Sequence, residues 1–268
     1  MAEKPIIAAG IDIGAATAKA VLLGTNGILS FSIMPTGHDV FQTGESVFQN
    51  ALDRADLSAD DVQYIVSTGY GRRAVSFAKK AVTEIICHAA GAGSVMPQAR
   101  TIIDIGGQDS KVIGLDDNNN VINFVMNDKC AAGTGRFLEV MARVLGVKID
   151  EMGPISFVSK EPCQISSTCT VFAESEMVSL RAEGKRREDI IAGIHKAMAH
   201  RIVIMGNSVG FNNTIVLTGG VAHNAGIKKA LEDEIGQQTQ LPEHPQIMGA
   251  LGAAILAKAA LEKQEKTS

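Results

Sequence analysis

The amino-acid sequence predicts an α/β fold built from two duplicated lobes with a nucleotide cleft between them. An eight-residue pattern, Asp-Ile-Gly with a Lys in the same frame, occurs at Asp12–Lys19 and again at Asp104–Lys111. A similar order of strands and helices is expected after each copy, which indicates a repeated lobe. A length of 268 residues suits two modest lobes better than one domain.

The first lobe, residues 1–98, is expected to hold three strands, a helix, a fourth strand and a further helix. Short apolar runs bounded by turn residues predict the strands, and a 3.6-residue apolar period predicts the first helix. The expected strands are 5–13, 18–23, 28–34 and 62–67, the first helix is 41–55, and a glycine turn over 68–74 opens the second helix.

The second lobe, residues 99–247, is expected to repeat this order. A final segment, 248–268, is expected to form a helix that packs back at the lobe junction. The expected strands are 101–105, 111–115, 121–126 and 214–217, and the helices are 134–145, 171–183, 187–209, 223–234 and 248–262.

Composition excludes several classes of protein. The chain is 46% hydrophobic and 20% charged, as in ordinary globular proteins. No apolar run approaches the roughly 20 residues of a membrane span, and the N-terminus lacks a signal-peptide layout, so we expect no membrane partner and a cytoplasmic location. The formal net charge is -4, and the only dense basic cluster is 185–187, so nucleic acid is not an expected partner.

The repeated pattern is typical of a clamp for phosphates. Glycines allow backbone N–H groups to approach an anion, an Asp can hold Mg2+ through water, and a Lys neutralises charge. We therefore predict that Asp12 and Asp104 bind Mg2+ through water and that Lys19 approaches the terminal phosphates. Gln108 or Asp109 is expected to orient the attacking water.

Three features resemble the ATPase superfamily of actin, heat-shock chaperones and sugar kinases. They are the two clamps, the turn Thr-Gly-Gly-Val-Ala-His-Asn at 218–224 and the start of the closing helix at 248–254. The resemblance implies the two-lobed actin-like (ribonuclease H-like) fold, with phosphates held by the clamps and adenosine by the 218–224 turn. The nucleotide-binding residues it implies are Gly14, Ala15, Ala16, Thr17, Lys19, Gly106, Gly107, Gln108, Asp109, Gly219, Gly220 and Asn224.

Two further motifs are similar to the ATP-dependent activators of 2-hydroxyacyl-CoA dehydratases and benzoyl-CoA reductases. They are Met-Asn-Asp-Lys-Cys-Ala-Ala-Gly-Thr-Gly-Arg at 126–136 and Ser-Ser-Thr-Cys-Thr-Val-Phe-Ala-Glu-Ser at 166–175. This resemblance spans nearly the whole chain. It implies an ATPase that binds ATP or ADP, acts as a one-electron donor, accepts its electron from ferredoxin or flavodoxin and passes it to an iron-sulfur dehydratase or reductase.

The same resemblance implies an oxygen-labile 4Fe-4S cluster on the twofold axis of a homodimer, bound by Cys130 and Cys169 of each subunit, with Gly133 beside it. Such a cluster takes four thiolates, and a dimer supplies four by symmetry. The residues themselves place each cysteine before a predicted helix, with Thr168 or Thr170 as a candidate N-cap for the second. The helix dipole would favour a thiolate there.

Several alternatives remain open from the residues alone. Cys130 and Cys169 would also suit structural zinc in a dimeric nucleotide sensor, or they could be buried thiols without a ligand. A small-molecule kinase of the same fold is a further alternative. Cys87 and Cys163 receive no role. Ala15 and Ala16 replace the hydroxyl side chains common in the resembling family, which would weaken a phosphate or metal contact.

Overall fold

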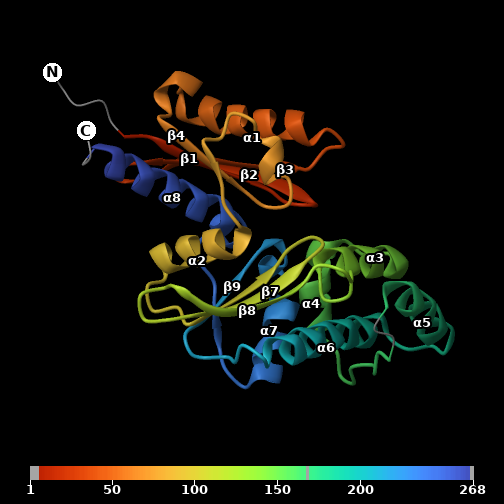
Figure 1. The fold of residues 1–268 in the computed structure, drawn as a ribbon. Coiled ribbons are helices and arrows are strands. Elements are labelled where there is room, and N and C mark those ends of the chain that lie inside the picture. The colour runs from red at the N-terminus through yellow and green to blue at the C-terminus, as the bar shows by residue number, and fades with distance from the viewer. Residues whose placement is uncertain (1–5, 167–168, 266–268) are drawn as a thin grey trace. The chain divides into compact units, whose positions relative to one another are not determined.

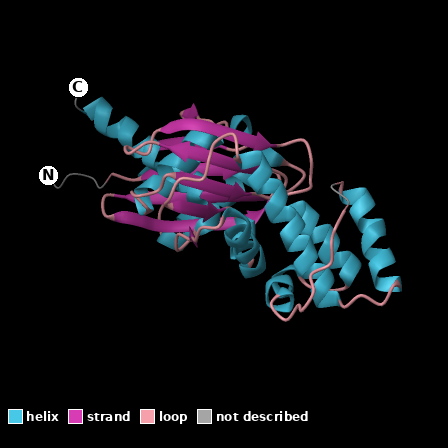
Figure 2. Ribbon diagram, turned by 90° about the horizontal axis from the view of Figure 1, so that it is seen from below, coloured by secondary structure: helices cyan, strands magenta, loops and turns pink. Residues whose placement is uncertain are grey.

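The structure is a computed structural model that describes residues 6–166 and 169–265. The chain divides into two compact units. The first unit contains Met1–Gln98, Asp116–Val121 and Gln246–Ser268, and the second contains Ala99–Leu115 and Ile122–Pro245. Figure 1 traces both units along the chain, and Figure 2 shows that helices flank the strands, as in other α/β proteins.

The first unit is built on a five-stranded sheet in the order β3-β2-β1-β4-β5. The central strand β1 pairs antiparallel with β2 and parallel with β4, and all its residues are buried. Because both faces of a central strand are covered, its sequence is mostly apolar throughout and does not alternate between apolar and polar residues. The strands are β1 (Ala8–Ile13), β2 (Thr17–Gly24), β3 (Gly27–Pro35), β4 (Tyr64–Thr68) and β5 (Lys80–Ala81).

Helices cover both faces of this sheet (Figure 1). Helix α1 (Val40–Ala55) packs its Val47 and Leu52 on Ile11 and Ile13 of β1. Its N-cap is Asp39, whose carboxylate accepts the Gln42 N–H. The other face is covered by α8 (Met248–Glu265), which packs on the sheet and on α2 (Glu84–Val95).

The second unit repeats the same strand order. Its sheet runs β10-β9-β6-β7-β8, in which β6 pairs antiparallel with β7 and parallel with β9. The strands β6, β7, β8, β9 and β10 therefore occupy the places of β1, β2, β3, β4 and β5, which confirms the predicted duplication. Their bounds are β6 (Thr101–Ile105), β7 (Ser110–Leu115), β8 (Val121–Asn127), β9 (Ile215–Thr218) and β10 (Thr239–Gln240).

The helices of the second unit share one apolar core with β6 and β9. This core includes Ile103, Leu138, Ile194 and Leu217, all of them at most 1% exposed. The helices are α3 (Gly135–Leu145), α4 (Met152–Ser156), α5 (Thr170–Ala182), α6 (Arg187–Gly206) and α7 (Ala225–Ile235).

One helix prediction in the first lobe is wrong. The glycine turn over 68–74 opens only a single 3-10 turn, Arg72–Ala74, because the Gly71 N–H donates to the Ile13 carbonyl and the chain then returns to the sheet as β5. The helix begins later, at Glu84. The predicted first strand starts too early, at Pro5, which lies outside the described residues, whereas β1 begins at Ala8.

Every helix in the described part of the chain is too short or too polar to cross a membrane.

Candidate functional site

The first clamp lies where β1 turns into β2. Asp12 and Lys19 are directly opposite each other in the antiparallel register, and the Lys19 Nζ lies 3.5 Å from the Asp12 Oδ2. Lys19 also donates to the Thr17 carbonyl, which accepts the Gly14 N–H as well. The spacing of seven residues in the sequence pattern is therefore the spacing that places these two charges across a tight hairpin.

The Asp12 carboxylate is enclosed by two glycines that come from other elements. A Cβ on Gly69 would lie 2.4 Å from the Asp12 Oδ1, and the backbone there has φ +84°. A Cβ on Gly249 would lie 3.1 Å from the Asp12 Oδ2 and 3.1 Å from the His88 Nε2. His88 on α2 thus faces the same space as Asp12, a proximity that the sequence did not signal.

The second clamp holds a buried ion-pair network. Lys111 lies opposite Asp104 in the β6–β7 register, and its Nζ is 3.2 Å from the Asp104 Oδ2 and 2.8 Å from the Asp109 Oδ2. Thr218, at the end of β9, donates its hydroxyl to the Asp104 Oδ1 at 2.8 Å. All four side chains are buried, and two carboxylates with one ammonium leave a net charge of about -1, which favours a cation nearby.

The two clamps differ at one equivalent position of the repeated pattern. The Gly14–Thr17 turn and the Gly106–Asp109 turn are closed by equivalent N–H to carbonyl bonds of 3.1 and 2.9 Å. Thr17 therefore stands where the second clamp has Asp109. Lacking this second carboxylate, Lys19 has only Asp12 as an ion-pair partner within the described residues, and it stays partly exposed.

Three predicted residues in the second clamp have different surroundings. Gln108 is exposed, whereas the Asp109 carboxylate is already paired with Lys111. Gly107 is half-buried beside them. Sequence reasoning assigned no role to Lys111 or Thr218, although Lys111 occupies the frame of Lys19.

The segment after β9 is ordered by hydrogen bonds within the second unit. Gly219 precedes a 3-10 turn, Gly220–His223, and Asn224 is the N-cap of α7. The Asn224 Oδ1 accepts the N–H groups of Gly226 and Ile227 at 2.9 and 3.1 Å, so this side-chain oxygen serves the helix. His223, at the end of the 3-10 turn, is exposed.

The His195 side chain on α6 packs against this segment. Its Nε2 lies 3.4 Å from the Asn224 Nδ2, and a Cβ on Gly226 would lie 2.4 Å from its Nδ1. The ring is only 1% exposed, and this burial lowers the pKa of His195 to about 4. A neutral imidazole is therefore packed between α6 and α7 at physiological pH.

Cys130 sits in a loop that Asn127 holds together. The Asn127 Nδ2 donates to the carbonyls of Cys130 and Ala132 at 2.8 and 3.1 Å, and its Oδ1 accepts the Cys130 N–H at 3.3 Å. Cys130 is half-buried. It lies four positions before Thr134, the N-cap of α3, so it precedes this helix in the order that the sequence predicted but is not part of the helix's first turn.

The N-terminus of α3 is bound to the second clamp. The N–H groups of Gly135 and Arg136 donate to the carbonyls of Gly106 and Gly107, each at 2.8 Å. Thr134 in turn donates its hydroxyl to the Ala131 carbonyl at 2.6 Å, next to Cys130. These bonds link the second clamp to the loop that carries Cys130, and they use two N–H groups at the start of α3 that a helix normally leaves without a partner inside the helix.

Cys169 is itself the N-cap of α5 and is exposed. The helix begins at Thr170, which is therefore not the cap, and Thr168 lies outside the described residues. The two residues after Thr170, Val171 and Phe172, are 67% and 68% exposed, so two adjacent apolar side chains lie on the surface beside this thiol.

The two remaining cysteines have other environments. Cys87 is fully buried in the core between α2 and α8, and burial raises the pKa of its thiol to about 12. Cys163 is half-buried, and its pKa is also raised by desolvation. Neither environment favours a thiolate. Among the described residues, no three His, Cys, Asp or Glu side chains converge as a ready-made metal site within one chain.

Residues 9–257 match the model of the BadF/BadG/BcrA/BcrD ATPase family. The chain is 46% identical over 251 residues to the 2-hydroxyisocaproyl-CoA dehydratase activator of Clostridioides difficile, covering 92% of this chain and 93% of that protein. It is also 46% identical to the activator of lactoyl-CoA dehydratase of Anaerotignum propionicum, covering 95% and 98%.

A solved structure is similarly close. The activator of the 2-hydroxyisocaproyl-CoA dehydratase from Clostridium difficile with bound ADPNP aligns with a TM-score of 0.94 at 42% identity, covering 98% of both chains. This likeness confirms the two-lobed actin-like ATPase fold that the sequence predicted.

Proposed function

The chain belongs to the BadF/BadG/BcrA/BcrD ATPase family, and on this basis we propose that it is an ATP-driven one-electron donor that activates a 2-hydroxyacyl-CoA dehydratase or a related iron-sulfur reductase. Two close relatives are named as activators of such dehydratases, and the similar solved structure holds an ATP analogue. The proposal includes a cytoplasmic homodimer that receives its electron from ferredoxin or flavodoxin.

At the nucleotide, Asp12 and Asp104 would hold Mg2+ through water, and Lys19 would reach the terminal phosphates. Lys19 suits this role because it is partly exposed and has one carboxylate partner among the described residues, whereas Lys111 is buried between two. Gln108, which is exposed, is the better candidate to orient the attacking water because Asp109 is already paired.

The remaining nucleotide contacts would come from backbone and turn residues. The N–H groups around Gly14 and Gly106 would face phosphates, and the Gly219–Gly220 turn with Asn224 would face adenosine. Ala15 and Ala16 remove side-chain hydroxyls from the first clamp but leave its backbone donors in place, so ATP binding would depend more on the second clamp.

Cys130 and Cys169 of two subunits would supply the four thiolates of a 4Fe-4S cluster. The residues fit this group: one thiol is half-buried in a loop of small residues, the other is exposed, and the described part of one chain offers no complete metal site. Exposed Val171 and Phe172 beside Cys169 provide apolar surface for a second subunit. The cluster would supply one-electron, low-potential chemistry.

The observation that carries the proposal is the hydrogen-bonded connection from the second clamp to Cys130. The carbonyls of Gly106 and Gly107 accept the first N–H groups of α3, and Thr134 ties the start of α3 to Ala131. A clamp that moves with the nucleotide state therefore displaces α3 and the cysteine loop together. The chain has a direct route by which phosphate chemistry can alter the surroundings of Cys130.

The test is metal analysis of protein purified without oxygen. We expect brown protein with about four irons per dimer, and loss of the iron after hours in air. Cys130→Ala should lose iron while nucleotide binding stays, and Cys163→Ala, in the same unit, should keep both. Colourless protein loaded with zinc, or iron retained by Cys130→Ala, would refute the proposal.

A further inference from the structure

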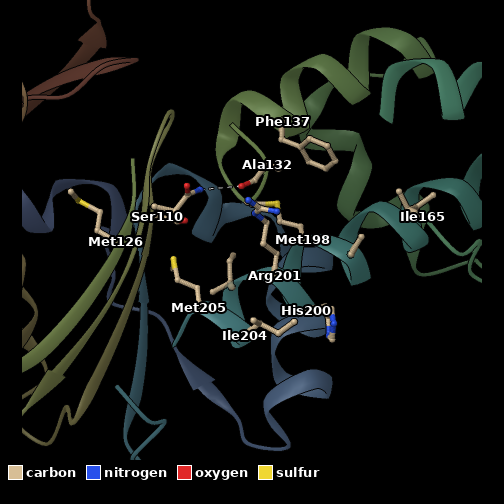
Figure 3. A pocket seen from close by; sticks show the side chains of 14 residues that line it. Ser110, Met126, Ala132, Phe137, Ile165, Met198, His200, Arg201, Ile204 and Met205 are labelled. Atoms are coloured by element: carbon tan, nitrogen blue, oxygen red, sulfur yellow. Dashed lines mark hydrogen bonds between the residues drawn. The ribbon is translucent and has the colours of Figure 1, made fainter. Parts of the chain in front are cut away.

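The second unit contains a cavity of about 510 Å3 beneath the loop that carries Cys130. That volume is in the range of sites that hold small organic ligands. Figure 3 shows the cavity between β7 and β8 on one side and α6 on the other. The wall is mostly apolar and includes Met126, Phe137, Met198, Ile204 and Met205. Methionine side chains adapt to ligands of different shape.

One cation, Arg201, reaches into this apolar space. Figure 3 shows its side chain rising through the cavity toward Ala132. Within the described residues its guanidinium has no ion-pair partner and no hydrogen-bond acceptor, and no Asp or Glu lines the cavity. The other basic residue of the wall, His200, is already paired with Glu234 at 2.6 Å.

The backbone at Gly133 borders this arginine. Gly133 has φ +89°, and a Cβ at this position would be in ordinary contact with the Arg201 Cδ at 3.4 Å, so the arginine side chain runs directly alongside this glycine. Arg201 is half-buried, so its charge has lost part of its hydration without gaining a carboxylate in the chain. A ligand that brings an anionic group would supply the missing partner.

We propose that this cavity binds a monocarboxylate with an aliphatic tail, with the carboxylate on Arg201 and the tail among the methionines. The planar guanidinium matches a carboxylate in a two-bond geometry. A phosphate group would need more donors than this one arginine supplies, and a cation would meet no counter-charge in the described wall. Of the residues that the sequence assigned to nucleotide or cluster, Gly133 alone lines the cavity.

Occupancy would have a local consequence at the cysteine loop. Asn127, Ala132 and Gly133 all line the cavity, and Asn127 also holds the backbone of Cys130. A bound tail would therefore pack against the underside of the loop. The proposed binding is a property of the chain itself and requires neither iron nor ATP.

The test compares octanoate with octanamide, which has the same tail without the charge, by calorimetric titration of the anaerobically purified protein. We expect octanoate to bind about tenfold more tightly or better. Arg201→Gln should remove this preference, whereas Arg143→Gln, an exposed arginine on α3, should keep it. Ala197→Leu, which fills the cavity from α6, should weaken both compounds.

The location is tested separately by NMR of methionine methyl groups. Octanoate should shift the signals of Met126, Met198 and Met205 and leave that of Met34, in the first unit, unchanged. Equal affinity for octanoate and octanamide, an unchanged preference in Arg201→Gln, or shifts that spare the three cavity methionines would each overturn the inference.

Discussion

Replacing Lys111 by Met should destabilise the second unit strongly. Lys111 is 1% exposed, and its Nζ contacts the Asp104 and Asp109 carboxylates at 3.2 and 2.8 Å. Removing one partner of a buried ion pair costs about 3 to 5 kcal/mol, because the remaining charge stays buried without compensation. Here two carboxylates would be left together, so we expect a loss in the upper part of that range.

Lys19→Met is the matched control, because it removes the lysine in the same frame of the first clamp. Lys19 pairs with one carboxylate at 3.5 Å, and its side chain is 12% exposed. We therefore expect a loss of about 1 to 2 kcal/mol, between the values of surface and buried pairs.

The assay is urea-induced unfolding followed by circular dichroism, fitted with a separate transition for each unit if two are resolved. Millimolar Mg2+ should stabilise Lys111→Met more than it stabilises the unchanged chain, because in the variant the cation replaces the lost ammonium group. If Lys111→Met lowers the free energy of unfolding no more than Lys19→Met does, then removing Lys111 does not leave two buried carboxylates without a counter-charge, and the prediction is refuted.

Three further predictions concern the second unit. The depressed pKa of His195, about 4 against 6.5, means that the unfolded chain binds a proton first as pH falls. Stability should therefore drop by about 2 kcal/mol between pH 7 and pH 5, measured by urea unfolding. His195→Gln should flatten this dependence, whereas the control His244→Gln, at a side chain that is 41% exposed, should not. Thr218→Val should cost about 1 to 3 kcal/mol in the same measurement, because one Asp104 oxygen loses its donor, and an unchanged midpoint would contradict that role. Asn127→Ala should speed alkylation of the Cys130 thiol, followed by mass spectrometry, because the loop loses three hydrogen bonds; an unchanged rate would show that Asn127 does not order it.

The hairpins of both clamps could be predicted because their signal is local. Asp12 and Lys19, seven positions apart, meet across one tight turn, and the second copy of the pattern repeats that geometry. The order of strands followed from the same repetition. The start of helix α2 was predicted too early because its Ala- and Gly-rich sequence, which packs closely on α8, has no clear amphipathic period to mark its bounds.

The contacts that distinguish the site could not be predicted because they join distant parts of the chain. Thr218 donates a hydrogen bond to Asp104, which lies 114 positions earlier in the sequence, and no local pattern predicts that bond. The same holds for the N–H groups of Gly135 and Arg136, which a helix start normally leaves free but which here serve the clamp carbonyls.

The difference between Thr17 and Asp109 has a consequence for sequence variation. In the second clamp, Lys111 offsets part of the negative charge of Asp104 and Asp109 in a buried space, so a change at one of the three alters a charge balance that only a matching change elsewhere can restore. Across homologous chains these three positions should be retained together or replaced together. Thr17 carries no charge, so a replacement there needs no matching change of a charged partner, and the two halves of this duplicated fold should diverge at different rates.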